Sequence, residues 1–499
     1  PAPKSGGAVH LGIAAKLTEL DPALAQYVTI FEWVYNFFEG LVEFGEGTDI
    51  RPCLAERWEI SEDGLTYTFK LKRGVRFHNG KELTALDVRD SFQRALHPLT
   101  KSPGTWAFEM IEGAEEFRKG NASEISGVNV IDPVTLKVRL SESVPFFLGM
   151  IAQPFAYVMP SELAKRYGPL VDVIGTGPFK LDRFIPDERI EMSRFDGYHN
   201  PPIPYLQRVV AEFGLTESEI ADGIRSGKFH YTSDLQKQYL SEFLVEPEWR
   251  PRLQTNVQLY TAFLAMSCRI PPLHDVRVRQ AIAYAIDRER IVRDIVGAEQ
   301  AVIARTLLPP GLPGHDPNAI GYPYDPVRSR SLLNAARIAE GTRLETWHGE
   351  AGSNLAVLRI IQENLKDVGI DLQIREVDPD VQNQAIEQGV VPIRMTRWLA
   401  DYPDPDNFLY VTFHSKSSVY NLGFENQEFD RLVQDARTLA DLQERVRLYQ
   451  RAEKIWMQEC HCVCLYHNRA LVLHQENVQG CVPHFTQPAI RLKKIWLSR

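Results

Sequence analysis

The feature that most constrains the fold of this sequence is an alternation of strand-like and helix-like patterns after residue 342. Three short runs have the pattern of strands: 343–349, 371–377 and 391–400. Two segments between them, 355–368 and 379–389, have the pattern of helices, and Gly369 predicts the end of the first one. Because successive parallel strands need crossover connections, this order predicts parallel strands joined by helices, as in α/β proteins.

The segment ADYPDPDNF (400–408) follows the third strand directly. Ligands of such sheets bind beyond the carboxyl ends of the strands, so we expect a small molecule to bind here. The candidate contacts are the carboxylate of Asp401, the neighbouring Tyr402 and the ring of Trp398. The series Asp401, Asp404 and Asp406 resembles a calcium loop only in spacing, since it lacks the sharp-turn glycine and the closing glutamate.

Composition excludes several classes of protein. A chain of 499 residues is too long for one core and predicts about two or three domains. The net charge of −9 argues against a nucleic-acid partner, which needs a basic face. No apolar run approaches the roughly 18–20 residues that span a bilayer. The first residues contain no signal segment, so the chain is either cytoplasmic or has lost a targeting peptide.

Three of the six cysteines lie in the run CHCVC (460–464). In an extended run, Cys460, Cys462 and Cys464 would share one face, with parallel thiols that do not converge on a metal ion. Buried cysteine is a common small apolar residue, so we favour core packing. A disulfide involving Cys481 or Cys53 and a metal site stay open as alternatives.

The sequence lacks the motifs of common enzymes. It has no G-x-S-x-G elbow, no H-E-x-x-H zinc helix and no phosphate-binding loop. Gly175 and Gly177 in GTGPF lie too close together for a dinucleotide fingerprint, so we expect them to serve close packing. We therefore predict no catalytic residue, no cofactor and no bound metal.

Residues 54–96 combine a hairpin with a capped helix. The runs 54–60 and 65–71 alternate apolar and polar residues around an Asp-Gly turn, which predicts a β-hairpin. Thr84 with Asp87 is a variant of the capping box, and predicts a helix that buries Val88, Phe92 and Leu96.

Residues 271–292, PPLHDVRVRQAIAYAIDRERIV, predict two helices capped by Asp275 and Asp287. Four arginines lie in this run, and charge runs are usually solvated, so we favour a solvated or inter-lobe salt-bridged face over an anion site. They are Arg277, Arg279, Arg288 and Arg290.

The run 54–96 resembles the signature of the family 5 extracellular solute-binding proteins, the oligopeptide-, dipeptide- and nickel-binding components of ABC importers. Other runs resemble landmarks of that family in the same order along essentially the whole chain. They are GGAVHLGI with LDPA, GTGPFKL (175–181), the run 271–292, DPDNF (404–408) and CLYHNRAL (464–471).

The resemblance implies an α/β, two-lobed periplasmic-binding-protein-like fold (type II, cluster C) with an extra subdomain inserted in the first lobe. The expected limits are 1–42, 155–265 and 473–499 for lobe I, 43–154 for the inserted subdomain, and 266–472 for lobe II. Two crossings, near residues 265 and 473, would form a hinge.

The resemblance also implies a ligand site. In peptide-binding members, the aspartate after the third strand pairs with the ligand's α-amino group, which would be the role of Asp401. Dipeptide-type members carry an arginine for the ligand carboxylate where this chain has Trp347, His348 and Glu350, so strict dipeptide specificity is in doubt. The expected ligand-binding residues are Asp401, Trp398, Tyr402, Tyr27, Thr29, Trp106, His348 and Tyr420.

The implied function is not enzymatic. It is the binding of a small solute, a peptide or another amine-bearing compound, in an inter-lobe cleft, and its delivery to the membrane permease of an ABC importer. A monomer in the periplasm or outside the cell is expected, with its signal peptide removed and a lipid anchor left open. The alternatives are a hydrolase acting in the same cleft and a protein that binds nickel or a metal chelate.

Overall fold

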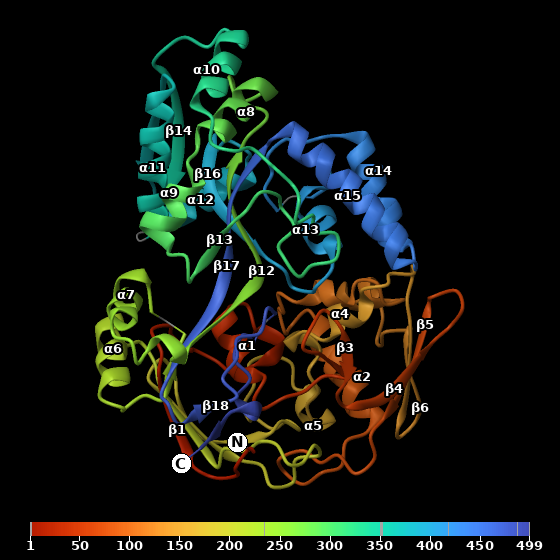
Figure 1. The fold of residues 1–499 in the computed structure, drawn as a ribbon. Helices are drawn as coiled ribbons and strands as arrows, with labels where there is room; N and C mark the ends of the chain where they lie inside the picture. The colour runs from red at the N-terminus through yellow and green to blue at the C-terminus, as the bar shows by residue number, and fades with distance from the viewer. Residues whose placement is uncertain (1, 234, 350–352, 418, 487, 499) are drawn as a thin grey trace. The chain divides into compact units, whose positions relative to one another are not determined.

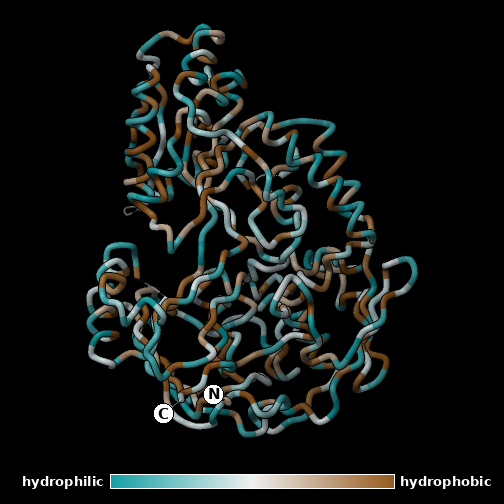
Figure 2. Tube along the Cα trace, in the orientation of Figure 1, coloured by the Kyte–Doolittle hydropathy of each residue, from teal (hydrophilic) through white to brown (hydrophobic). Residues whose placement is uncertain are grey.

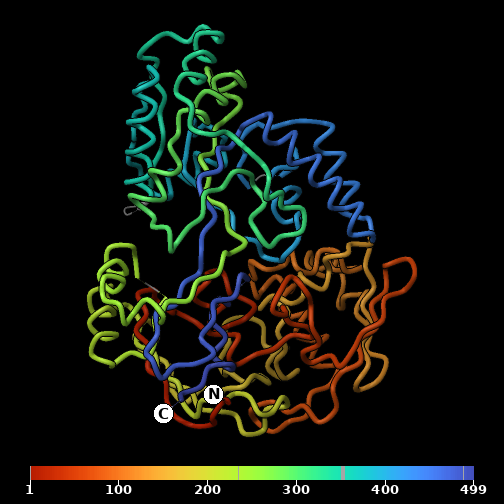
Figure 3. Tube along the Cα trace, viewed as in Figure 1, coloured from red at the N-terminus to blue at the C-terminus, as the bar shows by residue number. Residues whose placement is uncertain are grey.

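The computed structural model describes residues 2–498 except 234, 350–352, 418 and 487. It has two compact units: unit 1 is Pro1–Asn256 with Ala470–Arg499, and unit 2 is Val257–Arg469. The chain passes between the units in two neighbouring strands, β12 (Leu253–Met266) and β17 (Cys462–His474), which Figure 3 shows in green and blue. The expected lobe limits, including the inserted subdomain at 43–154, stay predictions.

Unit 1 is built on a mixed sheet, in which β1 lies parallel to two neighbours. The strands of this sheet are β1 (Ala8–Gly12), β8 (Phe179–Ile185), β9 (Arg189–Arg194), β10 (Arg208–Glu212) and β11 (Tyr231–Thr232). Their order is β11-β1-β10-β9-β8, and β1 runs parallel to β10 and β11. Two short strand pairs complete this part: β2 (Val42–Phe44) with β3 (Ile50–Pro52), and β18 (Val478–Gln479) with β19 (Trp496–Leu497).

A second sheet of unit 1 is antiparallel and four-stranded. Its strands are β4 (Ala55–Ile60), β5 (Thr66–Leu71), β6 (Val128–Asp132) and β7 (Thr135–Arg139), in the order β4-β5-β7-β6. The pairing of β4 with β5 confirms the predicted hairpin. The helices of unit 1 are α1 (Val28–Val34), α2 (Ala85–Leu96), α3 (Ala114–Arg118), α4 (Phe147–Ile151), α5 (Ser161–Ala164), α6 (Glu217–Arg225) and α7 (Lys237–Val245).

The capping box predicted for α2 is present. The Asp87 carboxylate accepts the backbone N–H of Thr84 at 2.8 Å, so a donor at the helix start is satisfied. Val88, Phe92 and Leu96 are buried on one face of this helix, as the apolar spacing predicted.

Helix α1 ends at Val34, and the chain turns after Tyr35. Gly175 and Gly177 lie against this turn, and a Cβ added to either would come within 2.0 Å or 2.7 Å of the Phe37 carbonyl oxygen, respectively. The predicted packing role of these glycines is therefore confirmed. Thr29 lies inside α1 and not in the loop before it, whereas Tyr27 is the N-cap residue.

Unit 2 contains the predicted alternation of strands and helices. The elements are β14 (Thr342–His348), α11 (Ser353–Asp367), β15 (Ile370–Glu376), α12 (Pro379–Glu387) and β16 (Ile393–Leu399). β14 lies between β15 and β16 and is parallel to both, so the predicted parallel arrangement is confirmed. Gly369 ends the α11 segment with a φ of +89°, a backbone conformation that glycine adopts without strain.

The remaining elements of unit 2 pack around this sheet (Figure 1). They are α8 (Val276–Ala285), α9 (Arg288–Ile291), the π-helical turn η5 (Val292–Val296), β13 (Ala301–Ile303), α10 (Pro326–Ala335), α13 (Pro405–Phe413), α14 (Gln427–Thr438) and α15 (Leu442–Glu459). One core joins α8 and α11 to β14 through residues such as Ile282, Ile361 and Leu344. Figure 2 shows hydrophobic positions recurring along the otherwise hydrophilic α14 and α15.

The arginines of 271–292 do not all form a solvated face: Arg279 lies 3.6 Å from the Glu459 carboxylate in an ion pair, and Arg288 bonds backbone carbonyl groups. Arg279 is 3% exposed and donates to the backbone oxygens of Glu459 and Leu273. Arg288 is half-buried and donates to the backbone oxygens of Cys464 and Tyr322. Both side chains thus supply donors to backbone carbonyl groups of other segments, and the charge pattern holds no information about these contacts.

All six cysteines are free thiols, and five are buried, so core packing is the role that the structure gives them. Cys460 is not part of the strand: it ends α15 in a left-handed conformation with φ of 48°, and β17 begins at Cys462. Three thiols therefore do not share one strand face. His461 between them is fully buried against the rings of Phe413 and Phe424. In the described part of the chain, no His, Cys, Asp and Glu group of three or more could hold a metal ion.

Among the described residues, no helix has both the length and the apolar character needed to cross a membrane.

Candidate ligand-binding site

Strand β16 has one edge that the sheet leaves open. On one side β16 pairs with β12 along its whole length, from Ile393 to Leu399. On the other side β14 meets it at a single position, Thr346 opposite Ile393, and ends at His348. Within the described residues, no strand pairs with β16 on that side beyond this position. This side of residues 394–399, which faces away from β12, is the free edge of β16.

Alternate residues of the free edge, Met395, Arg397 and Leu399, direct their peptide groups away from β12. The N–H of Ala400 donates to the Leu259 carbonyl oxygen at 2.8 Å, so Ala400 faces β12. In antiparallel pairs the direction alternates from residue to residue. Arg397 and Leu399 therefore direct their N–H and C=O groups toward the free edge, where Arg397 O accepts the Tyr420 hydroxyl at 2.8 Å. This edge can pair with an extended chain.

At the carboxyl end of β16, one amide joins two of the predicted site residues. The side-chain oxygen of Asn407 accepts the indole N–H of Trp398 at 2.9 Å and the backbone N–H of Asp401 at 3.0 Å. The Asn407 side-chain nitrogen donates to a carboxylate oxygen of Asp401 at 3.3 Å. Burial raises the pKa of Asp401 to about 6, and the hydrogen bond from Asn407 opposes that rise.

The third predicted residue of this loop, Tyr402, has a different environment. Its side chain is 2% exposed, and its hydroxyl donates to a carboxylate oxygen of Asp406 at 2.8 Å. Tyr449 from α15 donates to the other oxygen of Asp406, and Arg445 donates to Asp404 at 2.8 Å. These contacts fix the position of the first turn of α13, which follows Asp401 in the chain.

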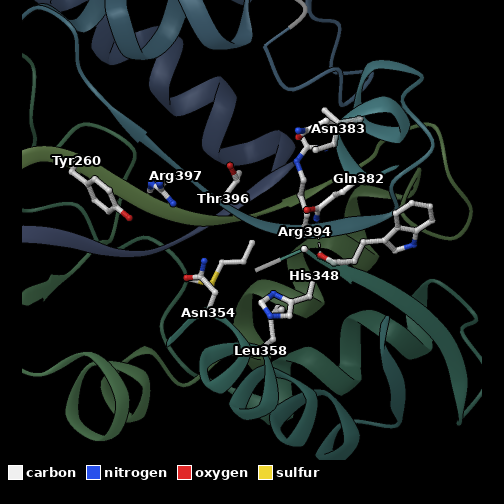
Figure 4. A pocket seen from close by; sticks show the side chains of 13 residues that line it. Tyr260, His348, Asn354, Leu358, Gln382, Asn383, Arg394, Thr396 and Arg397 are labelled. Carbon is white, nitrogen blue, oxygen red and sulfur yellow. Dashed lines mark hydrogen bonds between the residues drawn. The ribbon is translucent and has the colours of Figure 1, made fainter. Parts of the chain in front are cut away.

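A pocket of about 190 Å³ lies along the free edge of β16. Figure 4 shows Tyr260 and Arg397 at one end and the α12 residues Gln382 and Asn383 at the other. His348 lines this pocket, and Gln382 donates to the carbonyl oxygen of Trp347 at 3.1 Å. The remaining described lining residues are Trp347, Gly349, Asn354, Leu358, Ile386, Arg394, Met395 and Thr396. Glu350, which the sequence placed in this neighbourhood, lies outside the described residues.

The charged side chains in the described lining of the pocket are two arginines. Arg394 is 5% exposed and donates to the Tyr420 carbonyl oxygen at 2.8 Å, whereas Arg397 is exposed. Burial lowers the pKa of Arg394. Among the residues that the structure describes, neither guanidinium forms an ion pair with a carboxylate. An anionic group would therefore meet two positively charged side chains in this pocket.

The other predicted site residues fall into two groups. Tyr420 packs edge-on against the ring of Trp398, with ring centroids 6.2 Å apart. Unit 2 therefore places Tyr420 beside the predicted site residue Trp398. Tyr27, Thr29 and Trp106 belong to unit 1. Tyr27 is 66% exposed at the start of α1, and the half-buried Trp106 packs edge-on against Phe155. Their contact with a ligand stays a prediction.

Sequence reasoning missed Asn407, Arg394 and Arg397. Asn407 belongs to the run DPDNF, so its position was noticed but its partners were not. The two arginines lie in the run VPIRMTRWLA, where a strand was predicted, and two cations on a strand next to a ligand loop are a signal that could have found them.

Comparison with known proteins places the whole chain among solute-binding proteins. The model of the bacterial extracellular solute-binding proteins, family 5, matches residues 49–419. The dipeptide-binding protein of Escherichia coli K12 is 30% identical over 484 residues, which are 89% of this chain and 86% of that protein. The glutathione-binding protein GsiB of Escherichia coli O1:K1 is 26% identical over 485 residues, 95% of this chain and 91% of that protein.

A solved structure has the same fold over the full length. Clavulanic acid biosynthesis oligopeptide binding protein 2 covers 100% of this chain and 97% of its own, with a TM-score of 0.90 and 23% identity. The two-lobed fold predicted from the sequence is confirmed. The chain belongs to the family 5 bacterial extracellular solute-binding proteins.

Proposed function

We propose that this protein captures a short peptide, or a peptide-like amine, along the free edge of β16 and delivers it to an ABC importer. The observation that carries this proposal is the arrangement of three features on one strand. A carboxylate follows the strand, an open backbone edge runs along it, and arginines lie toward its start.

The carboxylate would receive the positive end of the ligand. Burial already raises the pKa of Asp401 to about 6, so the empty site carries part of the cost of a desolvated charge. An ammonium group that enters would pair with this carboxylate and relieve the cost. Trp398, half-buried and bonded to Asn407, would pack beside the ligand.

The open edge would receive the main chain of the ligand. An extended peptide that adds to a sheet edge gains backbone hydrogen bonds that do not depend on its side chains. The peptide groups of Arg397 and Leu399 point to this side, with one carbonyl oxygen already bonded to Tyr420. This mode suits a protein that accepts peptides of different sequence.

The pocket would receive the negative end. Arg397 and Arg394 lie four and seven residues before Asp401, which corresponds to roughly 13 Å and roughly 23 Å along a strand. Extended peptides of about four to seven residues span those lengths. A dipeptide is too short for either length, which agrees with the absence of an arginine at the end of β14.

Several parts of this function rest on the family and the relatives. One relative is described as dipeptide-binding and another as glutathione-binding, which supports a peptide-like ligand here. Delivery to a membrane permease, action as a monomer, a location in the periplasm and the absence of catalysis belong to this proposal. Enclosure of the ligand between the lobes would be seen as a smaller radius of gyration in solution scattering on saturation.

The test is calorimetric titration with alanine peptides of about two to eight residues, a range that covers the span from Asp401 to Arg394, each in free, N-acetylated and C-amidated form. We expect affinity to rise with length until the carboxylate reaches the arginines, and to fall on either modification. Equal affinity for free and N-acetylated peptides at every length would refute the proposal. Mass spectrometry before and after incubation shows whether the peptides stay intact, which separates binding from hydrolysis.

A further inference from the structure

Asp401 and Trp398 form the amine site of the proposed function. Asn407 contacts both of them but does not itself lie at the end of β16. It lies in the first turn of α13, and its side chain is 1% exposed. Its three hydrogen bonds go to the indole of Trp398 and to the backbone and carboxylate of Asp401. A single buried amide thus joins the aromatic and the acidic group.

The chemistry of the partners fixes the orientation of this amide. The indole N–H of Trp398 and the backbone N–H of Asp401 can only donate, so the oxygen of Asn407 must face both. Two donors occupy both lone pairs of that oxygen, and the NH₂ group is left facing the carboxylate. Leucine at this position would supply none of these bonds, and aspartate would supply the acceptor but not the donor.

The position of Asn407 is itself held from the other side. Asp404 caps α13, accepting the N–H of Asp406 at 3.0 Å and a bond from Arg445 of α15. Tyr449 of the same helix donates to Asp406. The first turn of α13, with Asn407 in it, is therefore anchored to α15 and cannot shift without breaking buried polar contacts.

We propose that Asn407 is the positioning residue of the amine site. It holds the Trp398 ring and the Asp401 carboxylate in one geometry before a ligand binds, so that binding orders neither side chain. Such preorganisation raises affinity by removing the entropy loss of ordering the site. The inference rests on the proposed function only for the identity of the group that Asp401 receives.

The test uses the empty protein, so that it does not depend on the ligand. The indole ¹⁵N–¹H signal of Trp398, assigned with Trp398→Phe, reports its hydrogen bond. The ¹³Cγ titration of Asp401, assigned with Asp401→Asn, reports the bond to its carboxylate. We expect Asn407→Leu to shift the indole signal and to raise the pKa of Asp401 by about one pH unit, because the donated bond is lost.

Asn407→Asp keeps the shape and separates the two bonds. The new carboxylate still accepts both N–H groups, so the Trp398 signal should stay near its wild-type position. Its second oxygen would stand where a donor stood, next to Asp401, so the two carboxyl groups should share one proton and titrate in two steps. Rescue of the indole signal together with a changed titration is a result that general loss of stability cannot produce.

Asn364→Leu is the matched control. Asn364 is also buried, at 4% exposure, and its side-chain oxygen accepts the backbone N–H of Asp287 at 3.0 Å. This variant should lower the melting temperature and leave both signals unchanged. Unchanged signals in Asn407→Leu, or equal changes in Asn364→Leu, would overturn the inference. If Asn407→Leu does not fold, Asn407→Asp decides alone. In that case, a titration of Asp401 in a single step, at the same pKa as in wild type, would overturn the inference.

Failure of the proposed function has a separate signature. In that case wild type would bind free and N-acetylated peptides equally. The Trp398 signal and the Asp401 titration would still change when Asn407 is substituted.

Discussion

The two ends of the free edge of β16 carry opposite charges, and the protein holds them in different ways. Asp401, at the carboxyl end, sits in a loop and is fixed by the amide of Asn407. Arg394, toward the amino end, belongs to the strand itself and donates to a backbone carbonyl. Burial raises the pKa of the first and lowers the pKa of the second, so both charged forms are disfavoured in the empty protein.

This contrast teaches how one strand can select a zwitterion. Each end carries a desolvation cost that a ligand charge of opposite sign would relieve. A neutral compound relieves neither cost, and a simple amine relieves only one. Selectivity for peptides then follows from the spacing of two charges along a strand, without contacts to any particular side chain.

The largest effect is expected at the acidic end. Asp401→Asn keeps the shape and removes the charge, so an alanine peptide should lose about 2–5 kcal/mol of binding free energy. N-acetylated peptides should bind this variant and wild type alike, because they carry no ammonium group. Calorimetry measures both. A change within about twofold, below ~0.5 kcal/mol, would mean that Asp401 is a turn residue.

The cationic end should give the next largest effect. Arg394→Met removes a buried guanidinium and should cost peptides with a free carboxylate about 1.5–3 kcal/mol, the range for hydrogen bonds to charged groups. C-amidated peptides of the same length should lose far less. If both forms lose equally, Arg394 supports the strand through Tyr420 and does not meet the ligand.

A pH titration sharpens the comparison because the two ends ionise in different ranges. Below about pH 6, Asp401 takes up a proton, so the affinity for the ammonium end should fall about tenfold per pH unit, while Arg394 stays charged. The pKa of Asp401 in the folded protein lies above the ordinary value of an aspartate, so the empty protein should gain stability as pH falls through about 6. Asp401→Asn should remove both trends. Affinity that stays constant from about pH 8 to 5 would contradict the role of this carboxylate.

The smallest effect is expected at Arg397. Its side chain is exposed, so solvent and salt screen its charge. Arg397→Gln should cost about 0.2–1 kcal/mol, and high salt should abolish the difference from wild type. A loss as large as that of Arg394→Met, unaffected by salt, would show that the ligand encloses this residue.

Features set by local sequence could be predicted. The Thr84–Asp87 capping box lies within four consecutive residues, so its hydrogen bonds depend on local sequence alone. The alternation of strands and helices around β14 followed from periodicity, because each buried face repeats along its own element, and the alternation predicted the parallel arrangement. Asp401 was chosen as a candidate for the same reason, since it follows a predicted strand, and its contact with a ligand stays a prediction.

Features set by packing could not be predicted. Arg279 is buried because carbonyl oxygens from distant segments converge on it, and a charge pattern holds no information about those segments. The free edge of β16 exists because β14 ends at His348 while β12 continues, which depends on pairing between strands far apart in the chain. Asn407 was visible in its motif, but the positioning role proposed for it depends on the anchoring of α13 by α15.

The burial of the native thiols has a practical consequence for following binding by fluorescence. Burial raises the pKa of each cysteine, including half-buried Cys268, so few thiolates are available to react with a dye near neutral pH. Asn383 is exposed and lines the pocket, so Asn383→Cys would introduce a thiol of ordinary reactivity there. An environment-sensitive dye on that thiol would turn the protein into an optical sensor for its own solute.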